Sequence, residues 1–210
     1  MEKVLLVRYA EIHLKGLNRP FFERLLVDRI KQALNPVHPS VEREQGRIFV
    51  YGVPEEEISD CIDRLRRVFG IHSISIACCV EKNWDAIKDA AVQETKAFAE
   101  TASVPTFKCF ARRSDKRFPM TSEEICRELG HEILEAYPNM TVDVHHPALP
   151  VTVEIRQNNA FVYTAEVLGS GGMPVGSNGK AMLLISGGID SPVAGYMIAK
   201  RGVMLDAVHF

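Results

Sequence analysis

Along the first 80 residues, short apolar runs alternate with stretches whose apolar residues recur every three to four positions. The short runs are typical of strands, and the helical spacing of Phe22, Leu26 and Ile30 predicts an amphipathic helix. The pattern predicts, in chain order, a strand over 4–8, a helix beginning near Pro20, strands over 38–44 and 47–52 joined at Gln45-Gly46, a helix from about Pro54 and a strand over 71–80. This βαββαβ order predicts a ferredoxin-like unit.

After residue 80 the composition shifts towards alanine and other good helix formers. Thr121, followed three residues later by Glu124, has the spacing of a capping box, which marks the start of a helix. The expected elements are a helix over 84–102, a strand over 106–113, a helix from Thr121, and strands over 142–144, 151–156 and 161–166. They predict a second α+β module that does not repeat the first.

A glycine-rich segment over 169–179 follows the second module. Its composition is typical of a linker, but Met173 and Val175 indicate that it packs against the protein. The wholly apolar run over 181–185 predicts a strand covered on both faces, as in a parallel α/β sheet. Residues 203–210 predict a second strand of that sheet.

The turn after residue 185 carries the candidate chemistry. Gly187 and Gly188 let the backbone bend sharply and let bare N–H groups approach an anion. Ser191 is expected to cap the next helix, with Pro192 at its first position and Gly202 at its end. Unpaired N–H groups and the helix dipole act together at such an N-terminus, so we expect a negatively charged ligand there.

The residues of this turn do not match the common nucleotide loops. A Walker A loop needs Lys and then Ser or Thr inside the glycine turn, whereas Gly179-Lys180-Ala181 precedes the strand and lacks the hydroxyl residue. The hexapeptide Ser186-Gly187-Gly188-Ile189-Asp190-Ser191 instead resembles the PP-loop of ATP pyrophosphatases. Those enzymes split ATP into AMP and pyrophosphate while activating an oxygen as its adenylate. The alternative is a glycine turn that only joins a strand to a helix.

Composition narrows the class of protein. The 210 residues are 46% hydrophobic and 25% charged with a formal net charge of −2, so RNA binding requires a local basic patch. No apolar run approaches the roughly 18 residues of a membrane helix, and no signal peptide is recognisable. Five cysteines without a CxxC pair predict reduced thiols in a cytoplasmic protein, no metal site, and packing roles for Cys61, Cys78, Cys79, Cys109 and Cys126.

A basic patch lies in the second module. Five cations stand against the single Asp115 within ten residues, namely Lys108, Arg112, Arg113, Lys116 and Arg117. Phosphate contacts from such a group would position RNA without reading its sequence, and we predict RNA binding here. The alternative is a solvated loop. Phe118 has two readings, stacking on a base or, as its neighbour Pro119 favours, packing in the interior.

Further motifs run along the whole chain. They are Arg8-Tyr9-Ala10-Glu11, Leu14-Lys15-Gly16-Leu17-Asn18-Arg19, Val68-Phe69-Gly70-Ile71, Arg113 with Lys116 and Phe118-Pro119, Asp143-Val144-His145, Val153-Glu154-Ile155-Arg156 and Gly172-Met173-Pro174-Val175-Gly176. Together with the glycine turn they resemble the motifs of tRNA 4-thiouridine synthetases, also called tRNA sulfurtransferases. The departures from the usual family pattern are Ala10, His146 and Met173, none of which lies in the phosphate loop.

The resemblance implies an α+β N-terminal half, made of a ferredoxin-like domain and a THUMP domain, and then the start of an α/β PP-loop domain (adenine nucleotide alpha hydrolase-like). The expected boundaries are 1–59 for the ferredoxin-like domain, whose last strand runs to about 80, 60–166 for the THUMP domain, 167–179 for the linker and 180–210 for the PP-loop domain. A doubly wound domain needs about five strands, so we expect the last domain to be truncated and the family's sulfur-carrying cysteine to lie beyond residue 210.

By resemblance, the reaction is ATP-dependent formation of 4-thiouridine: the uridine at position eight of tRNA is adenylated at O4, and persulfide sulfur then displaces AMP. The implied cofactors are ATP and Mg²⁺. The implied partners are the acceptor-stem region of tRNA, a cysteine desulfurase and a ThiS-like sulfur carrier, the last for thiamine thiazole synthesis. The residues expected to bind ATP are Leu183, Leu184, Ser186, Gly187, Gly188, Asp190, Ser191, Val208 and His209, of which Asp190 is also the expected catalytic residue.

Several alternatives stay open. Asp190 has a purely structural alternative, a carboxylate on the helix dipole, and His209 has one as a polar strand end. A different function class is a PP-loop ligase that adenylates a small molecule, for which the basic patch is incidental. A third is a tRNA binder that catalyses nothing. We expect the 210 residues alone to bind tRNA but to be inactive in pyrophosphate release.

Overall fold

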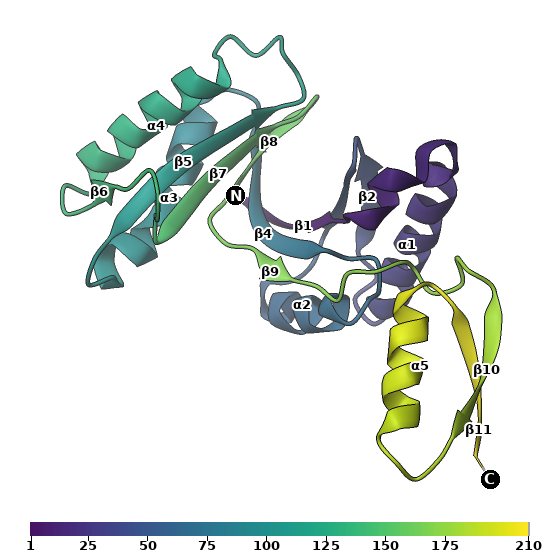
Figure 1. Cartoon of the computed structure of the whole chain (residues 1–210). Coiled ribbons are helices and arrows are strands. Elements are labelled where there is room, and N and C mark those ends of the chain that lie inside the picture. Colours follow the sequence, from purple (N-terminus) through teal and green to yellow (C-terminus); the bar gives the residue numbers. More distant parts are fainter. Residues whose placement is uncertain (210) are drawn as a thin grey trace. The chain divides into compact units, whose positions relative to one another are not determined.

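The computed structural model describes residues 1–209 and divides the chain into two compact units. The first unit comprises Leu5–Ile74 and Glu166–Phe210, and the second comprises Met1–Val4 and Ser75–Ala165. Each unit has its own hydrophobic core, as expected for independently packed modules. Figure 1 labels the α-helices and the strands other than β3.

The first unit begins with the predicted βαββαβ order. Its strands lie in the order β2-β3-β1-β4, and β3 is antiparallel to both β1 and β2. The elements are β1 (Glu2–Arg8), the 3₁₀ helix η1 (Glu11–Asn18), α1 (Arg19–Ala33), β2 (Ser40–Glu44), β3 (Arg47–Tyr51), the 3₁₀ helix η2 (Glu55–Glu57), α2 (Ile58–Arg66) and β4 (Ser73–Glu81). The ferredoxin-like fold predicted for this part of the chain is confirmed.

Helices α1 and α2 pack together over one face of these strands. Alternate residues of a strand point to the same face, so Leu5 and Val7 of β1 enter the core beside Ile48 and Val50 of β3. The apolar stripe of α1 predicted from helical spacing, which includes Leu26, is buried against them. The periodicity of the sequence therefore placed the core of this domain correctly.

The β2–β3 hairpin turns at Gln45 and Gly46, as predicted. Their φ angles are 38° and 84°, so both residues lie in the left-handed region. A two-residue hairpin loop needs positive φ at both central positions because this geometry matches the twist of the strands. The turn therefore fixes the register of β2 and β3, which pairs Glu44 with Arg47.

The second unit contains the remaining α+β module. Its strand order is β4-β8-β7-β5-β6, in which β5 is parallel to both β6 and β7 while β8 is antiparallel to β4 and β7. The elements after β4 are α3 (Trp84–Thr101), β5 (Thr106–Arg113), α4 (Ser122–Ala136), β6 (Thr141–Val142), β7 (Leu149–Ile155) and β8 (Asn159–Tyr163).

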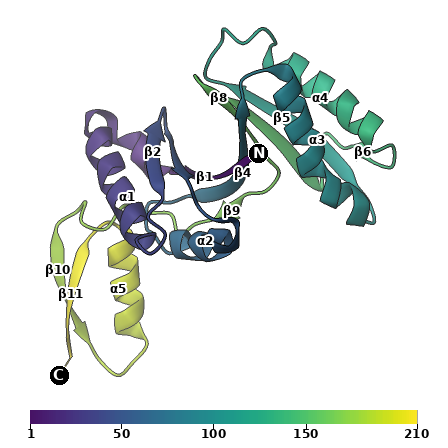
Figure 2. The same ribbon diagram turned by 180° about the vertical axis from the view of Figure 1, so that it is seen from behind.

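Helices α3 and α4 lie against the same face of this sheet (Figures 1 and 2). Phe107, Val151 and Val153 point from the strands into the core that the two helices close. The start of α4 has the predicted capping box: the Glu124 amide donates to Thr121 Oγ1 at 3.2 Å, and the Thr121 amide donates to the Glu124 carboxylate at 2.7 Å. The spacing of Thr121 and Glu124 in the sequence was therefore sufficient to predict the start of α4.

Two predicted strand boundaries are wrong. The strand expected over 161–166 is β8 and ends at Tyr163, and the strand expected over 142–144 is only the two residues of β6. A further short strand, β9 (Val167–Leu168), lies at the start of the predicted linker. It pairs with Ser73 and Ile74 of β4, a tertiary contact that local composition does not indicate.

The rest of the linker is packed down, as Met173 and Val175 predicted. Met173 is fully buried, and its amide donates to the Lys200 carbonyl at 2.9 Å. The Gly70 amide donates to the Gly171 carbonyl at 2.8 Å, and the Gly171 amide donates to the Ile71 carbonyl at 2.7 Å. Backbone hydrogen bonds therefore join the linker to the loop before β4 on one side and to the last helix on the other.

The chain ends in a βαβ unit made of β10 (Lys180–Ile185), α5 (Asp190–Lys200) and β11 (Met204–His209). The strands are parallel, as predicted, and within the described residues β10 is covered on one face only. Met182 is 59% and Leu184 61% exposed, because α5 packs only on the other face, where Gly195 lies against Leu183.

The docking of the linker predicts the effect of two substitutions. Gly171 and Gly172 both have positive φ, but a Cβ at Gly172 would lie 2.2 Å from the Lys200 carbonyl oxygen, whereas one at Gly171 would meet nothing within 4 Å. Gly172→Ala should lower the free energy of unfolding by roughly 1–3 kcal/mol more than the control Gly171→Ala, measured by urea denaturation. Equal losses would show that this close approach does not matter.

Candidate nucleotide and RNA sites

The glycine turn lies between β10 and α5, at the carboxyl end of the parallel strand pair. The register pairs Leu184 with Val208 and Ile185 with His209, so both strands end at the same edge. Ligands of α/β folds bind beyond the carboxyl ends of parallel strands. The local fold therefore places the turn where a nucleotide site is expected.

The predicted cap of α5 is wrong. The helix begins at Asp190, one residue before the predicted cap Ser191, and the N-cap residue is Ile189, which already has helical φ and ψ. The Ser191 hydroxyl instead accepts a hydrogen bond from the Ser186 amide at 3.1 Å and lies 3.4 Å from the Ser186 hydroxyl. This serine braces the loop by tying its first residue to the helix.

The loop presents open N–H donors. Within residues 1–209, the amides of Gly187, Gly188 and Ile189 make no hydrogen bond, and all three residues are exposed. They precede an 11-residue helix, whose dipole adds partial positive charge at this end. Open amides, the dipole and two serine hydroxyls form a donor set that fits phosphate oxygens.

Asp190 lies in the first turn of α5 and is exposed. A carboxylate at this position is favourable on the helix dipole, so its placement agrees with both roles considered for it. Among the residues that the structure describes, no three His, Cys, Asp or Glu side chains come together as a ready metal site. A divalent cation here would need phosphate oxygens as further ligands.

The strand ends beside the loop differ in character. His209 Nδ1 lies 2.9 Å from the Ile185 carbonyl oxygen, so its ring holds the end of β10 to the end of β11. This contact favours the role of a polar strand end for His209. Leu184 is exposed and Leu183 and Val208 are partly buried, which leaves apolar surface next to the loop.

The five predicted RNA-binding cations fall into distinct environments. Lys108, on β5, donates to the Val144 carbonyl at 2.9 Å and lies 5.1 Å from the centre of the Phe110 ring. Arg112 and Lys116 are exposed, and within the described part of the chain their side chains form no hydrogen bond or ion pair. These last two are the cations most available to a phosphate.

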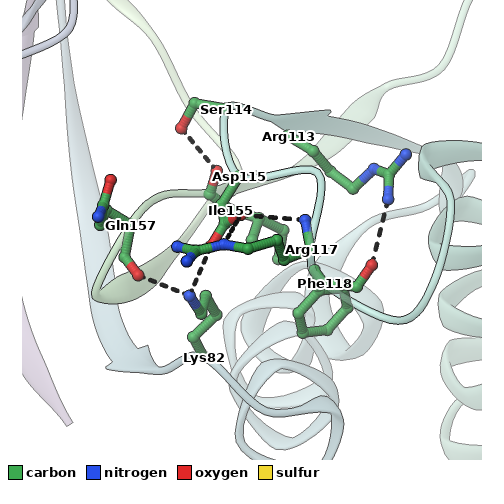
Figure 3. Close-up of polar contacts among 8 residues, drawn as sticks. All are labelled: Lys82, Arg113, Ser114, Asp115, Arg117, Phe118, Ile155 and Gln157. Carbon is green, nitrogen blue, oxygen red and sulfur yellow. Dashed lines mark hydrogen bonds and ion pairs between the residues drawn. The ribbon is translucent and has the colours of Figure 1, made fainter.

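Asp115 clasps two cations at the loop after β5 (Figure 3). Its carboxylate accepts from Arg117 Nε at 2.9 Å and Nη2 at 3.0 Å, from the Arg117 amide at 3.0 Å and from Lys82 Nζ at 2.8 Å. These bonds, those of Arg117 first, hold the pKa of Asp115 well below its usual range. Lys82 also donates to the Gln157 carbonyl at 2.6 Å, so the clasp joins this loop to the β7–β8 turn.

Arg113 holds the same loop in another way. Its Nη1 donates to the Met120 carbonyl at 2.6 Å and to the Phe118 carbonyl at 3.3 Å, the latter drawn in Figure 3. Phe118 is only 5% exposed, which supports packing rather than base stacking as its role. Arg113 therefore shapes the basic loop, and its replacement would disturb neighbouring cations as well as remove a charge.

Lys82 was missed by the sequence reading. It lies 33 residues before Asp115 in the sequence, directly after the last residue of β4, and has no other cation next to it. Only the pairing of Glu81 with Asn159 brings it to the turn beside the basic loop. No local pattern in the sequence could have indicated this contact.

The cysteine side chains have the properties of packing residues. The five cysteines are free, and burial raises the pKa of Cys109 to about 12 and that of Cys79 to about 11. A thiol with a raised pKa is a poor nucleophile, which favours the packing role predicted for these residues.

No helix among residues 1–209 is both long and apolar enough to cross a bilayer.

Three family models match successive parts of the chain. Residues 4–75 match the ThiI ferredoxin-like domain, residues 81–165 the THUMP domain, and residues 176–210 the Thiamine biosynthesis protein (ThiI). The fold and the glycine turn thus define a class, a THUMP protein that continues into a PP-loop nucleotide fold.

Individual relatives agree with this class. The chain is 48% identical to a probable tRNA sulfurtransferase of Alkaliphilus oremlandii and 46% identical to one of Lachnoclostridium phytofermentans, in each case over 100% of this chain and 54% of the relative. A crystal structure of a 4-thiouridine synthetase–RNA complex with bound ATP matches with a TM-score of 0.88 and 37% identity, over 100% of this chain and 53% of that one. A Pyrococcus horikoshii crystal structure matches with a TM-score of 0.89 and 32% identity, over 99% of this chain and 68% of that one.

The chain belongs to the ThiI family of tRNA sulfurtransferases. The resemblance drawn from its sequence motifs is confirmed. The chain spans about half the length of the curated relatives it matches.

The Asp115 clasp predicts a pH-dependent contribution to stability. Its folded pKa lies below the usual value of about 3.9, so the carboxylate stabilises the folded state above about pH 4, and this is lost as the pH falls through the folded pKa. Asp115→Asn should therefore lower the urea midpoint at pH 7, and its difference from the wild type should shrink in acid. The exposed Asp89, in the interior of α3, supplies the control Asp89→Asn, which should change little at either pH. A difference that grows in acid would contradict the assignment.

Proposed function

We propose that this chain is the RNA-binding and phosphate-binding part of an ATP-dependent tRNA sulfurtransferase that forms 4-thiouridine. The observation that carries the proposal is the set of open amides at Gly187, Gly188 and Ile189, ahead of α5, in a chain of the ThiI family. It is supported by the related 4-thiouridine synthetase, whose crystal structure contains both RNA and ATP.

The proposed reaction has two steps. The O4 atom of the uridine at position eight of tRNA attacks the α-phosphate of ATP, and pyrophosphate leaves. In the second step the outer sulfur of a persulfide forms a bond to C4 of the uridine while AMP leaves with the former O4, and a thiol then attacks the inner sulfur, so that the S–S bond breaks and a disulfide is left beside 4-thiouridine. A cysteine desulfurase is the proposed source of the persulfide sulfur, and a ThiS-like carrier for thiamine thiazole synthesis is a proposed second acceptor.

The loop residues have distinct proposed roles. The amides of Gly187 and Gly188 and the hydroxyls of Ser186 and Ser191 donate to phosphate oxygens, where they stabilise the charge on departing pyrophosphate. Asp190 is the proposed ligand or orienting group for Mg²⁺, which commonly binds through one or two carboxylates together with substrate phosphates. Adenine is proposed to lie beside the strand ends, near Leu183, Leu184, Val208 and His209.

RNA binding is assigned to β5 and the loop after it. Arg112 and Lys116 are the proposed primary phosphate contacts because they are exposed and carry no partner among the described residues. Lys108, Arg113 and Arg117 are engaged by the protein and support the surface. We propose the acceptor-stem region of tRNA as the ligand, and we keep the domain boundaries 1–59, 60–166, 167–179 and 180–210 as proposals.

Asp190→Asn tests the nucleotide site. In a polypeptide with the full length of the relatives, this change should reduce tRNA-dependent pyrophosphate release from ATP by about 100-fold or more, because it removes a charge that orients Mg²⁺ or the loop. Binding of tRNA should not change. The control is Asp206→Asn, which removes an exposed carboxylate from β11. Full activity of Asp190→Asn would reject the catalytic role.

Lys116→Ala tests the RNA site in the 210-residue chain. Filter binding of tRNA should weaken, and the slope of log K against log salt should become shallower by roughly 0.7 to 0.9, the value for one lost phosphate contact. Lys96→Ala, on the exposed side of α3, is the matched control and should leave both quantities unchanged. If the wild-type chain does not bind tRNA, the RNA function fails and a ligase for a small molecule becomes the better reading.

A further inference from the structure

The ferredoxin-like domain contains a cavity that the proposed chemistry does not use. Its volume is about 490 Å³. The walls come from the end of η1, the start of α1 and the β2–β3 hairpin: Gly16, Leu17, Arg19, Pro20, Glu23, Arg43, Gln45 and Gly46. We call this feature the Arg19–Arg43 cavity.

A buried carboxylate organises the cavity. Glu23 is only 6% exposed, and its two oxygens accept from Arg19 Nε at 2.7 Å and from Arg43 Nη1 at 2.9 Å. The Tyr9 hydroxyl, which is also buried, donates to the same carboxylate. Burial opposes ionisation of Glu23, but the hydrogen bonds from Tyr9 and Arg19 outweigh it and lower its pKa. The carboxylate therefore stays charged and fixes both guanidinium groups.

The two arginines keep donors to spare. A guanidinium has five N–H groups, and the contacts to Glu23 and to the Tyr9 hydroxyl use two nitrogens of Arg19, while Arg43 gives one nitrogen to Glu23. Their side chains are 34% and 39% exposed, so further donors reach the cavity. The two arginines share the single carboxylate of Glu23, which leaves a net positive charge at the mouth of the cavity.

The start of α1 adds to this charge. The helix has 15 residues, no acidic residue in its first turn and no side-chain cap, and Pro20 at its N-terminus lines the cavity. The positive end of its dipole is therefore not neutralised by its own first turn. A buried ion pair is weak evidence for a stabilising role, because apolar residues of similar volume often pack as well. A ligand for the two arginines explains why the carboxylate is present.

We propose that the Arg19–Arg43 cavity binds a phosphate group of an RNA backbone, with Arg19 and Arg43 as donors positioned by Glu23. The inference rests on the proposed RNA-binding function and adds a contact on the ferredoxin-like domain. Two half-exposed guanidinium groups would hold a free anion weakly in water, whereas a phosphate in a polymer also gains from the contacts made elsewhere along the RNA. RNA is therefore favoured over free phosphate or pyrophosphate as the ligand.

The test compares three arginine variants of the 210-residue chain, two that remove a charge and one that keeps it. Arg43→Gln should weaken tRNA binding by about fivefold near 0.1 M salt and make the salt slope shallower by roughly 0.7 to 0.9. Arg24→Gln, on α1 next to Glu23 but not in the cavity wall, should leave the slope unchanged. Arg43→Lys, which keeps a cation, should restore most of the slope. Thermal unfolding of each variant checks that it folds.

A measurement on the unaltered chain makes the test independent of folding. Bound tRNA should protect Arg19 and Arg43, but not Arg24, from modification by phenylglyoxal, read by mass spectrometry. An unchanged salt slope in Arg43→Gln, or absence of protection, would overturn the inference. Calorimetry with sodium pyrophosphate is the second arm: binding that depends on Arg43 without any change in the tRNA slope would assign the cavity to a free anion instead. Failure of the wild type to bind tRNA would reject the proposed function itself.

Discussion

Parallel pairing of β10 with β11 is the constraint on which the proposed nucleotide site depends. In a parallel pair the chain must return through a crossover, so α5 starts at the carboxyl edge of β10 and points its N-terminus there. The Ser186–Ser191 hydrogen bond and the contact of His209 with the Ile185 carbonyl hold this edge on both sides. Amides that would be satisfied inside a longer helix are left open in a braced loop.

Each of the two modules that precede this loop contains a carboxylate that pairs with two cations. Asp115 holds Lys82 and Arg117 in the second unit, and Glu23 holds Arg19 and Arg43 in the first. A carboxylate between two cations offsets their repulsion and restricts their side chains, while one positive charge remains for a ligand. This arrangement supports the proposed phosphate sites in a chain whose formal net charge is −2.

The sequence predictions were correct for features that depend on neighbouring residues and wrong for features that depend on tertiary contacts. The Gln45-Gly46 turn and the Thr121–Glu124 capping box were correct because each depends on residues within a few positions of one another. The cap at Ser191 was wrong although the residue type was suitable, because its hydroxyl bonds to the strand end at Ser186.

The sequence by itself determined the order of the elements, the hydrophobic faces, the glycine turn and the family, since periodicity and motifs are written in neighbouring residues. Only the tertiary structure decided which cations are available. Lys82 reaches Asp115 across 33 residues and Arg43 reaches Glu23 across 20, because strand register brings them together. Charge can be counted along a chain, but its pairing depends on distances that exist only after the strands have aligned.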